Sequence, residues 1–139
     1  MKTFVISILA TALWLLVGSI DLFAQEETEL SGLEIVEAKL GKGVQDRMIV
    51  DEDTVFAKNS KVYLWMKVVG GASQRVELST DEITVTWTTG DRSYSTILTI
   101  GGSPWRTWAY KTVGITGDWT VTVTDASGNV LKEMSFRLE

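Results

Sequence analysis

Residues 82–88 read EITVTWT, and this stretch decides the fold class of the chain. Ile83, Val85 and Trp87 alternate with polar residues, which is typical of a β-strand with one buried and one solvated face. Residues 118–124, DWTVTVT, repeat the pattern with Trp119 at an apolar position. We therefore expect two strands with threonines on their wet faces and with Trp87 and Trp119 in a common core.

The same two-residue period recurs on both sides of this stretch. Further strands are predicted at residues 33–40, 61–69, 94–100 and 130–138, with a short pairing at residues 48–50. Turn-forming residues separate these segments roughly every 8–12 residues, as in β-sandwiches. The pattern predicts an all-β, immunoglobulin-like antiparallel β-sandwich of six or seven strands, a single domain over residues 33–139 with Phe136 in its core. A small closed barrel is the alternative.

The N-terminal residues have the composition of an export signal. Lys2 precedes an apolar run at residues 4–17, and a more polar stretch ends at Ala24, where we expect cleavage. Residues 1–24 are therefore predicted to be a signal peptide, and residues 25–32 a flexible acidic lead-in. This predicts a periplasmic or secreted protein. A membrane anchor through residues 4–20 is the alternative, although about 20 apolar residues are usually needed to span a bilayer.

The chain contains no histidine and no cysteine. Ser-His-Asp and Cys-His catalysis are therefore excluded, as are zinc, haem and iron–sulfur sites that depend on those ligands. Loss of residues 1–24 would remove one base and one acid, so the formal net charge of −5 would not change. This charge argues against nucleic acid and against an anionic membrane as partners. We expect no enzyme activity and no cofactor.

Acidic side chains offer two weaker alternatives. Asp46, Asp51, Glu52 and Asp53 lie close in sequence but lack the alternating order of a helix-loop-helix calcium motif. We interpret them as a solvated loop and predict no metal site. A carboxylate-dependent glycan hydrolase is a distant alternative, because nothing in the sequence singles out a pair of acids.

Residues 101–111, GGSPWRTWAYK, concentrate aromatic and basic side chains. If the chain stays extended beyond the proline, Arg106, Trp108 and Tyr110 share one face, and Trp105 and Lys111 lie on the other. One interpretation is an aromatic platform with a cation, able to bind a sugar ring, a peptide or a carboxylate. The other is a corner in which Trp108 caps the core while the arginine stacks on a ring. We favour the core position for Trp108 and take Trp105, Arg106, Tyr110 and Lys111 as candidate binding residues.

Five motifs occur in a fixed order along residues 33–139. They are A-x-x-G-x-G-V-x-D-R (residues 38–47), I-x-x-x-W-x-x-G (83–90), I-G-G-S-P-W-R-T-W (100–108), G-x-W-T-V (117–121), and G-N-V-L (128–131) before Phe136. In this order the chain resembles a bacterial β-domain family of unknown function with the signature W-R-T-W-S-S-K, G-x-W-T-V and G-x-V-L. The chain departs from it at Pro104, where an arginine is common, and at Ala109 and Tyr110, where the family tends to have two serines. The resemblance implies an exported or membrane-attached domain without catalytic activity, and it implies no known ligand.

Together these features lead to one main hypothesis and one alternative. The main hypothesis is an exported, non-enzymatic domain that binds a protein or glycan partner in the cell envelope. The alternative is a purely structural module without a ligand of its own. An exposed edge strand would also allow self-association.

Overall fold

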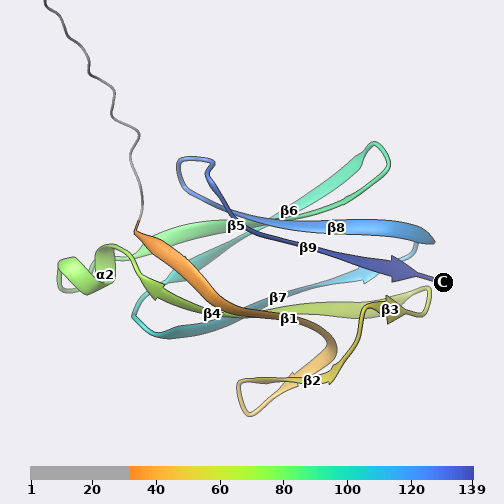
Figure 1. The fold of residues 1–139 in the computed structure, drawn as a ribbon, viewed down its shortest axis with the longest axis horizontal. Coiled ribbons are helices and arrows are strands. Elements are labelled where there is room, and N and C mark those ends of the chain that lie inside the picture. The colour runs from red at the N-terminus through yellow and green to blue at the C-terminus, as the bar shows by residue number, and fades with distance from the viewer. Residues whose placement is uncertain (1–31) are drawn as a thin grey trace, which may run out of the picture.

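The computed structural model describes residues 32–139, apart from the side chains of residues 73 and 74. The described part contains nine strands and one short helix (Figure 1): β1 (Leu33–Gln45), β2 (Met48–Glu52), β3 (Val55–Phe56), β4 (Ser60–Gly70), α2 (Ala72–Arg75), β5 (Asp81–Thr89), β6 (Arg92–Ile100), β7 (Trp105–Val113), β8 (Gly117–Asp125) and β9 (Val130–Leu138). The predicted signal peptide lies outside the described residues, as does the lead-in except for Gly32. Among the described residues, no helix is long and apolar enough to cross a membrane.

The strands form two facing sheets (Figure 1). One has the order β2-β1-β4-β7 and the other the order β3-β9-β8-β5-β6. All neighbouring strands run antiparallel except β3 and β9, which are parallel. The predicted all-β sandwich is therefore confirmed, with nine strands in the described residues instead of six or seven. The two additional strands are the two-residue β3, which is too short to show a period, and β7, whose residues were considered as an extended segment but not counted as a strand.

The core lies between the sheets and is built from inward-facing residues of both. Trp87 and Trp119 are 1% exposed and Phe136 is 4% exposed, so these three lie in the core where they were expected. The rings of Trp119 and Phe136 stack with centroids 5.9 Å apart. The opposite sheet contributes alternate residues of β4: Val62, Leu64, Met66 and Val68. Because a strand turns successive side chains to opposite faces, the intervening residues of β4 point away from this core.

Trp65 lies on that outward face and is nevertheless only 1% exposed. The hairpin of β1 and β2 folds back over this face (Figure 1), and the Trp65 indole N–H donates to the Arg47 carbonyl at its turn, 2.8 Å away. Gly41 makes room for the fold-back. A Cβ at this position would lie 2.6 Å from the Ile49 Cγ1 and 2.7 Å from the Val50 carbonyl oxygen. The hairpin thus covers the β1 side of the outer face and leaves the β7 side open.

Candidate functional site

The segment singled out in the sequence forms β7, an edge strand of the four-stranded sheet. It pairs antiparallel with β4, with Trp108 opposite Trp65 and Tyr110 opposite Tyr63. The alternation is the one expected for an extended chain, so the strand divides its side chains between two faces. On the outer face lie Arg106, Trp108, Tyr110 and Thr112, and on the inner face lie Trp105, Thr107, Ala109 and Lys111.

The prediction that Trp108 caps the core is wrong. Trp108 is half-buried on the outer face, and Trp105 packs against the core instead. The Trp105 ring lies against two preceding glycines, and a Cβ on Gly102 would sit 2.9 Å from its Cε3 atom. The pair Gly101-Gly102, interpreted from sequence only as a bend, is therefore the signal that identifies which tryptophan turns inward.

Lys111 also turns inward, at the open side of the sandwich between β7 and β6. Its Nζ lies 3.6 Å from the centroid of the Tyr94 ring, a cation–π contact. An inward-pointing charge on an edge strand opposes pairing with a second apolar edge. The four candidate binding residues therefore do not form one surface: Arg106 and Tyr110 lie on the outer face, and Trp105 and Lys111 on the inner face.

Arg106 and Tyr110 instead join residues of β4. The Tyr63 and Tyr110 rings have centroids 5.2 Å apart, and the Lys61 Nζ lies 4.9 Å from the Tyr110 centroid. Lys67 lies opposite Arg106 in the strand register. We name this surface the aromatic–basic face; it consists of Lys61, Tyr63, Lys67, Arg106, Trp108 and Tyr110.

The electrostatics of the aromatic–basic face differ from those of the whole chain. Lys61, Lys67 and Arg106 form no ion pair within residues 32–139, although the chain carries a net charge of −5. The nearest ion pair on this side of the sheet joins the Lys39 Nζ to the Glu37 Oε2 across 3.2 Å within β1. The β4 members were not predicted as functional candidates, although the alternation over residues 61–69 places Tyr63 and Lys67 on one face.

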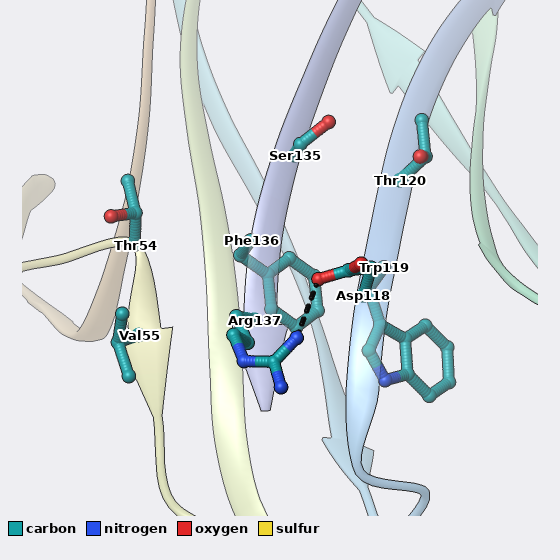
Figure 2. Close-up of a pocket in the computed structure, with 8 residues that line it drawn as sticks. All are labelled: Thr54, Val55, Asp118, Trp119, Thr120, Ser135, Phe136 and Arg137. Carbon is teal, nitrogen blue, oxygen red and sulfur yellow. Dashed lines mark hydrogen bonds and ion pairs between the residues drawn. The ribbon is translucent and has the colours of Figure 1, made fainter. Parts of the chain in front are cut away.

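A shallow depression at the opposite sheet is the second candidate site (Figure 2). It has a volume near 450 Å³ and is lined by Thr54, Val55, Asp118, Trp119, Thr120, Ser135, Phe136 and Arg137. Its two charged members neutralise each other, because the Arg137 guanidinium bonds the Asp118 carboxylate at 2.9 Å and also contacts Glu139 at 3.6 Å. Its aromatic members are almost fully buried in the core. The depression therefore offers hydroxyl groups but neither an unpaired charge nor an exposed ring.

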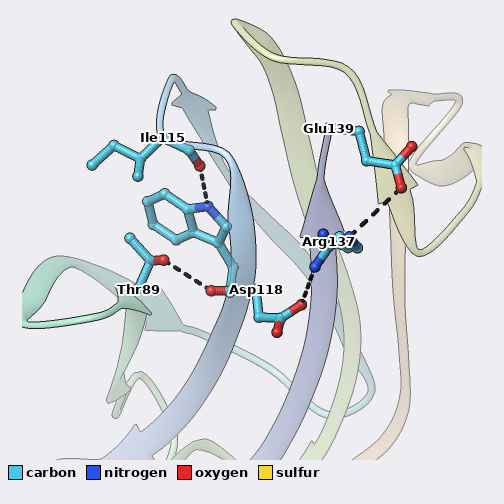
Figure 3. Close-up of polar contacts among 6 residues, drawn as sticks. Thr89, Ile115, Asp118, Arg137 and Glu139 are labelled. Atoms are coloured by element: carbon cyan, nitrogen blue, oxygen red, sulfur yellow. Dashed lines mark hydrogen bonds and ion pairs between the residues drawn. The ribbon is translucent and has the colours of Figure 1, made fainter.

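The polar contacts around this depression hold the end of the sandwich together (Figure 3). The Trp119 indole N–H donates to the Ile115 carbonyl at 2.8 Å, and the Thr89 hydroxyl donates to the Asp118 carbonyl at 2.8 Å. Buried polar groups need such partners to offset their desolvation. These hydrogen bonds give Trp119 and Thr89 a structural role in the fold that requires no ligand.

The acidic residues considered for calcium do not converge. Within residues 32–139, no three acidic side chains are grouped so that they could hold a metal ion. The Asp53 carboxylate accepts the backbone N–H groups of Thr54 at 2.8 Å and Val55 at 3.3 Å, and these bonds lower its pKa below the ordinary value. Asp46 and Asp51 adopt positive φ angles of 52° and 53°. Asp46 thus lies in the turn before β2, Asp51 within β2, and Asp53 directly after it.

Comparison with known proteins gives a family match for part of the chain and a fold match for most of it. Residues 80–138, which include β5 to β9, match the model of a family described as a protein of unknown function (DUF2914). No curated protein sequence matches the chain.

Two solved structures show the fold. An immunoglobulin-like protein from Pseudomonas aeruginosa has a TM-score of 0.59 at 14% identity, with 84% of this chain and 100% of that chain covered. An alkylpurine DNA glycosylase, AlkC, from Pseudomonas fluorescens, bound to DNA containing an abasic site analog, has a TM-score of 0.53 at 9% identity. That match covers 80% of this chain and 31% of the glycosylase. The predicted immunoglobulin-like fold is confirmed, and at these identities the likeness extends to the fold alone.

Proposed function

We propose that this immunoglobulin-like domain is a non-enzymatic binding module of the cell envelope, and that it contacts a protein or glycan partner through the aromatic–basic face. One observation carries the proposal: Tyr110 is 53% exposed on an edge strand, with the Lys61 Nζ 4.9 Å from its ring, and neither Lys61 nor Arg106 forms an ion pair among residues 32–139. Tyrosine, tryptophan and arginine are the residue types that dominate binding energy at protein interfaces.

The chemistry of the face supports binding rather than catalysis. Rigid aromatic rings supply contact area at a low cost in side-chain entropy, and adjacent cations orient an approaching carboxylate or other acidic group. None of the six residues that define the face is acidic, and Glu37, which lies opposite Lys67 in the β1–β4 register, is paired with Lys39. The chain as a whole lacks the histidine and cysteine on which most nucleophilic catalysis depends. Export is supported by the signal-like composition of residues 1–24.

Site-specific photocrosslinking in the native host tests this function. A photoreactive phenylalanine derivative replaces Tyr110 in one variant and Ile97 in a matched control, because Ile97 is 62% exposed on β6, the edge of the other sheet. We expect a crosslinked partner in the envelope fraction for position 110 and none for position 97. Adding Arg106→Ala is expected to reduce the crosslink while the melting temperature stays within about 2 °C, since the residue is exposed.

Two results would overturn the proposal. No crosslink at position 110 would favour the purely structural module. Equal crosslinks at both positions would show contact without preference for the aromatic–basic face. Mass spectrometry of the purified mature protein tests export separately, with Gln25 expected at the N-terminus.

A further inference from the structure

The outer edge of β7 has no partner strand among residues 32–139. In the order β2-β1-β4-β7, the strand bonds to β4 on one side only, along nine residues. Alternate residues of such a strand direct their N–H and C=O groups away from the sheet. An exposed edge of this kind is a template for an extended chain.

We propose that the partner contributes an extended acidic peptide segment that pairs antiparallel with β7 and becomes the fifth strand of this sheet. The inference rests on the proposed function and deepens it, because it names the chemistry of the partner. Antiparallel pairing is slightly more stable per residue than parallel pairing.

The outer face of β7 defines what the added strand must carry on that side. Residues directly opposite each other in an antiparallel pair have Cβ atoms about 4.5–5.5 Å apart. A carboxylate opposite Arg106 would therefore reach its guanidinium, with Lys67 one strand further on. Apolar β-branched residues opposite Trp108 and Tyr110 would pack on the aromatic rings.

The inner face adds a second requirement. Lys111 is half-buried at the open side of the sandwich, and its ammonium group lies over Tyr94. A residue of the added strand opposite Lys111 would bring a second carboxylate to this ammonium group, whereas the small buried Ala109 favours a small neighbour. Arg106 and Lys111 are five residues apart and face opposite sides, so the peptide carries two acids at the same spacing on opposite faces.

Other occupants match these features less well. A glycan can stack on the rings, but it has no main chain to bond with the nine-residue edge. A second copy of β7 would add two more cations and no acid to the same edge, which like-charge repulsion disfavours. An acidic extended chain complements both the backbone and the charges.

Nuclear magnetic resonance titration of the purified full chain tests the inference. The probe is the peptide Thr-Thr-Glu-Val-Ala-Val-Thr-Glu-Thr, whose glutamates fall opposite Arg106 and Lys111. One control peptide has lysine in place of both glutamates, and a second has N-methyl groups on the amides that would face β7. We expect slowed amide exchange along the outer edge of β7 with the probe alone, and no slowing along β6.

Variants of the protein test the charges. Arg106→Gln and Lys111→Gln are each expected to weaken binding of the probe about two- to fivefold, the range of exposed ion pairs. Arg92→Gln is the matched control, because Arg92 is an exposed cation on the edge strand β6, and it is expected to leave binding unchanged.

Several results would overturn the inference. The first group concerns the peptides: no binding of the probe, or binding of the lysine or N-methyl peptide as tight as that of the probe. The second concerns the place of binding: slowed amide exchange along β6, or slowed exchange along β7 caused by self-association alone. The last is binding of polygalacturonate at the aromatic–basic face without binding of the probe. If Tyr110 crosslinks an envelope partner while the probe fails, the acidic-strand inference fails and the proposed function stands. If the crosslink is also absent, both fail.

Discussion

Trp65→Phe is the substitution that most directly tests how the outer face of the four-stranded sheet is built. The change removes the indole N–H that donates to the Arg47 carbonyl at 2.8 Å, and it shortens a side chain that is 1% exposed. If the β1–β2 hairpin is held over the sheet by this residue, both losses destabilise the fold.

The expected magnitude follows from two contributions. Loss of the hydrogen bond costs about 1 kcal/mol. Loss of two buried carbons and the space that they leave costs about 1–2 kcal/mol. We therefore expect Trp65→Phe to lower the free energy of unfolding by about 2–3 kcal/mol, a fall of roughly 1–2 M in the urea midpoint.

Trp108→Phe is the matched control, because Trp108 lies directly opposite Trp65 on the same face and undergoes the same chemical change. It is half-buried and its indole donates to no residue within 32–139, so we expect a loss below about 1 kcal/mol. Urea unfolding followed by tryptophan fluorescence measures both. Hydrogen exchange over residues 41–50 is expected to accelerate only in Trp65→Phe. Equal losses, or a larger loss for Trp108→Phe, would refute the covered-face explanation.

Three further substitutions test other parts of the structure. Gly41→Ala is expected to lower the free energy of unfolding in urea by about 1–3 kcal/mol, because the added Cβ would meet residues of β2 where that strand folds back. Gly43→Ala is the control and is expected to be tolerated, because the nearest atom to a Cβ at Gly43 is 3.8 Å away. Similar losses for the two variants would contradict the fold-back. The lowered pKa of Asp53 means that its contribution to stability is present above the ordinary value of 3.8 and is lost as the pH falls through the lowered value. The stability difference between the unchanged protein and Asp53→Asn should therefore shrink in acid, and a difference independent of pH would exclude this role. Lys111→Val removes the inward charge of the edge strand β7, so analytical ultracentrifugation is expected to detect more self-association than in the unchanged protein. An unaltered sedimentation profile would show that Lys111 does not prevent β7 from pairing with a second copy.

Much of the fold follows from local pattern. The alternation in residues 82–88 and 118–124 correctly predicted which residues share a face, and the tryptophans of these strands lie in the core. The threonines between them face outward as expected. A period of two is a property of the extended backbone itself, so it can be read without knowledge of neighbouring strands.

The candidate site required more than this pattern. In β7 the alternation correctly separated Trp105 from Trp108, but it gave no reason to place either one inside. The packing of Trp105 on Gly101-Gly102 and the pairing of β7 with β4 made that choice. Likewise, Lys61 and Tyr63 became part of the site only because β4 lies beside β7.

The sequence by itself determined seven of the nine described strands, the two faces into which they divide, and the absence of histidine and cysteine chemistry. Only the tertiary structure decided which face of β7 is open and that Trp65 is covered by a hairpin. It also decided that Lys61, Tyr63 and Tyr110 meet on one face, with Lys67 and Arg106 further along the same two strands. The physical reason is that side-chain alternation depends on adjacent residues, whereas burial and charge clustering depend on strands that are distant along the chain and meet only in the folded sandwich.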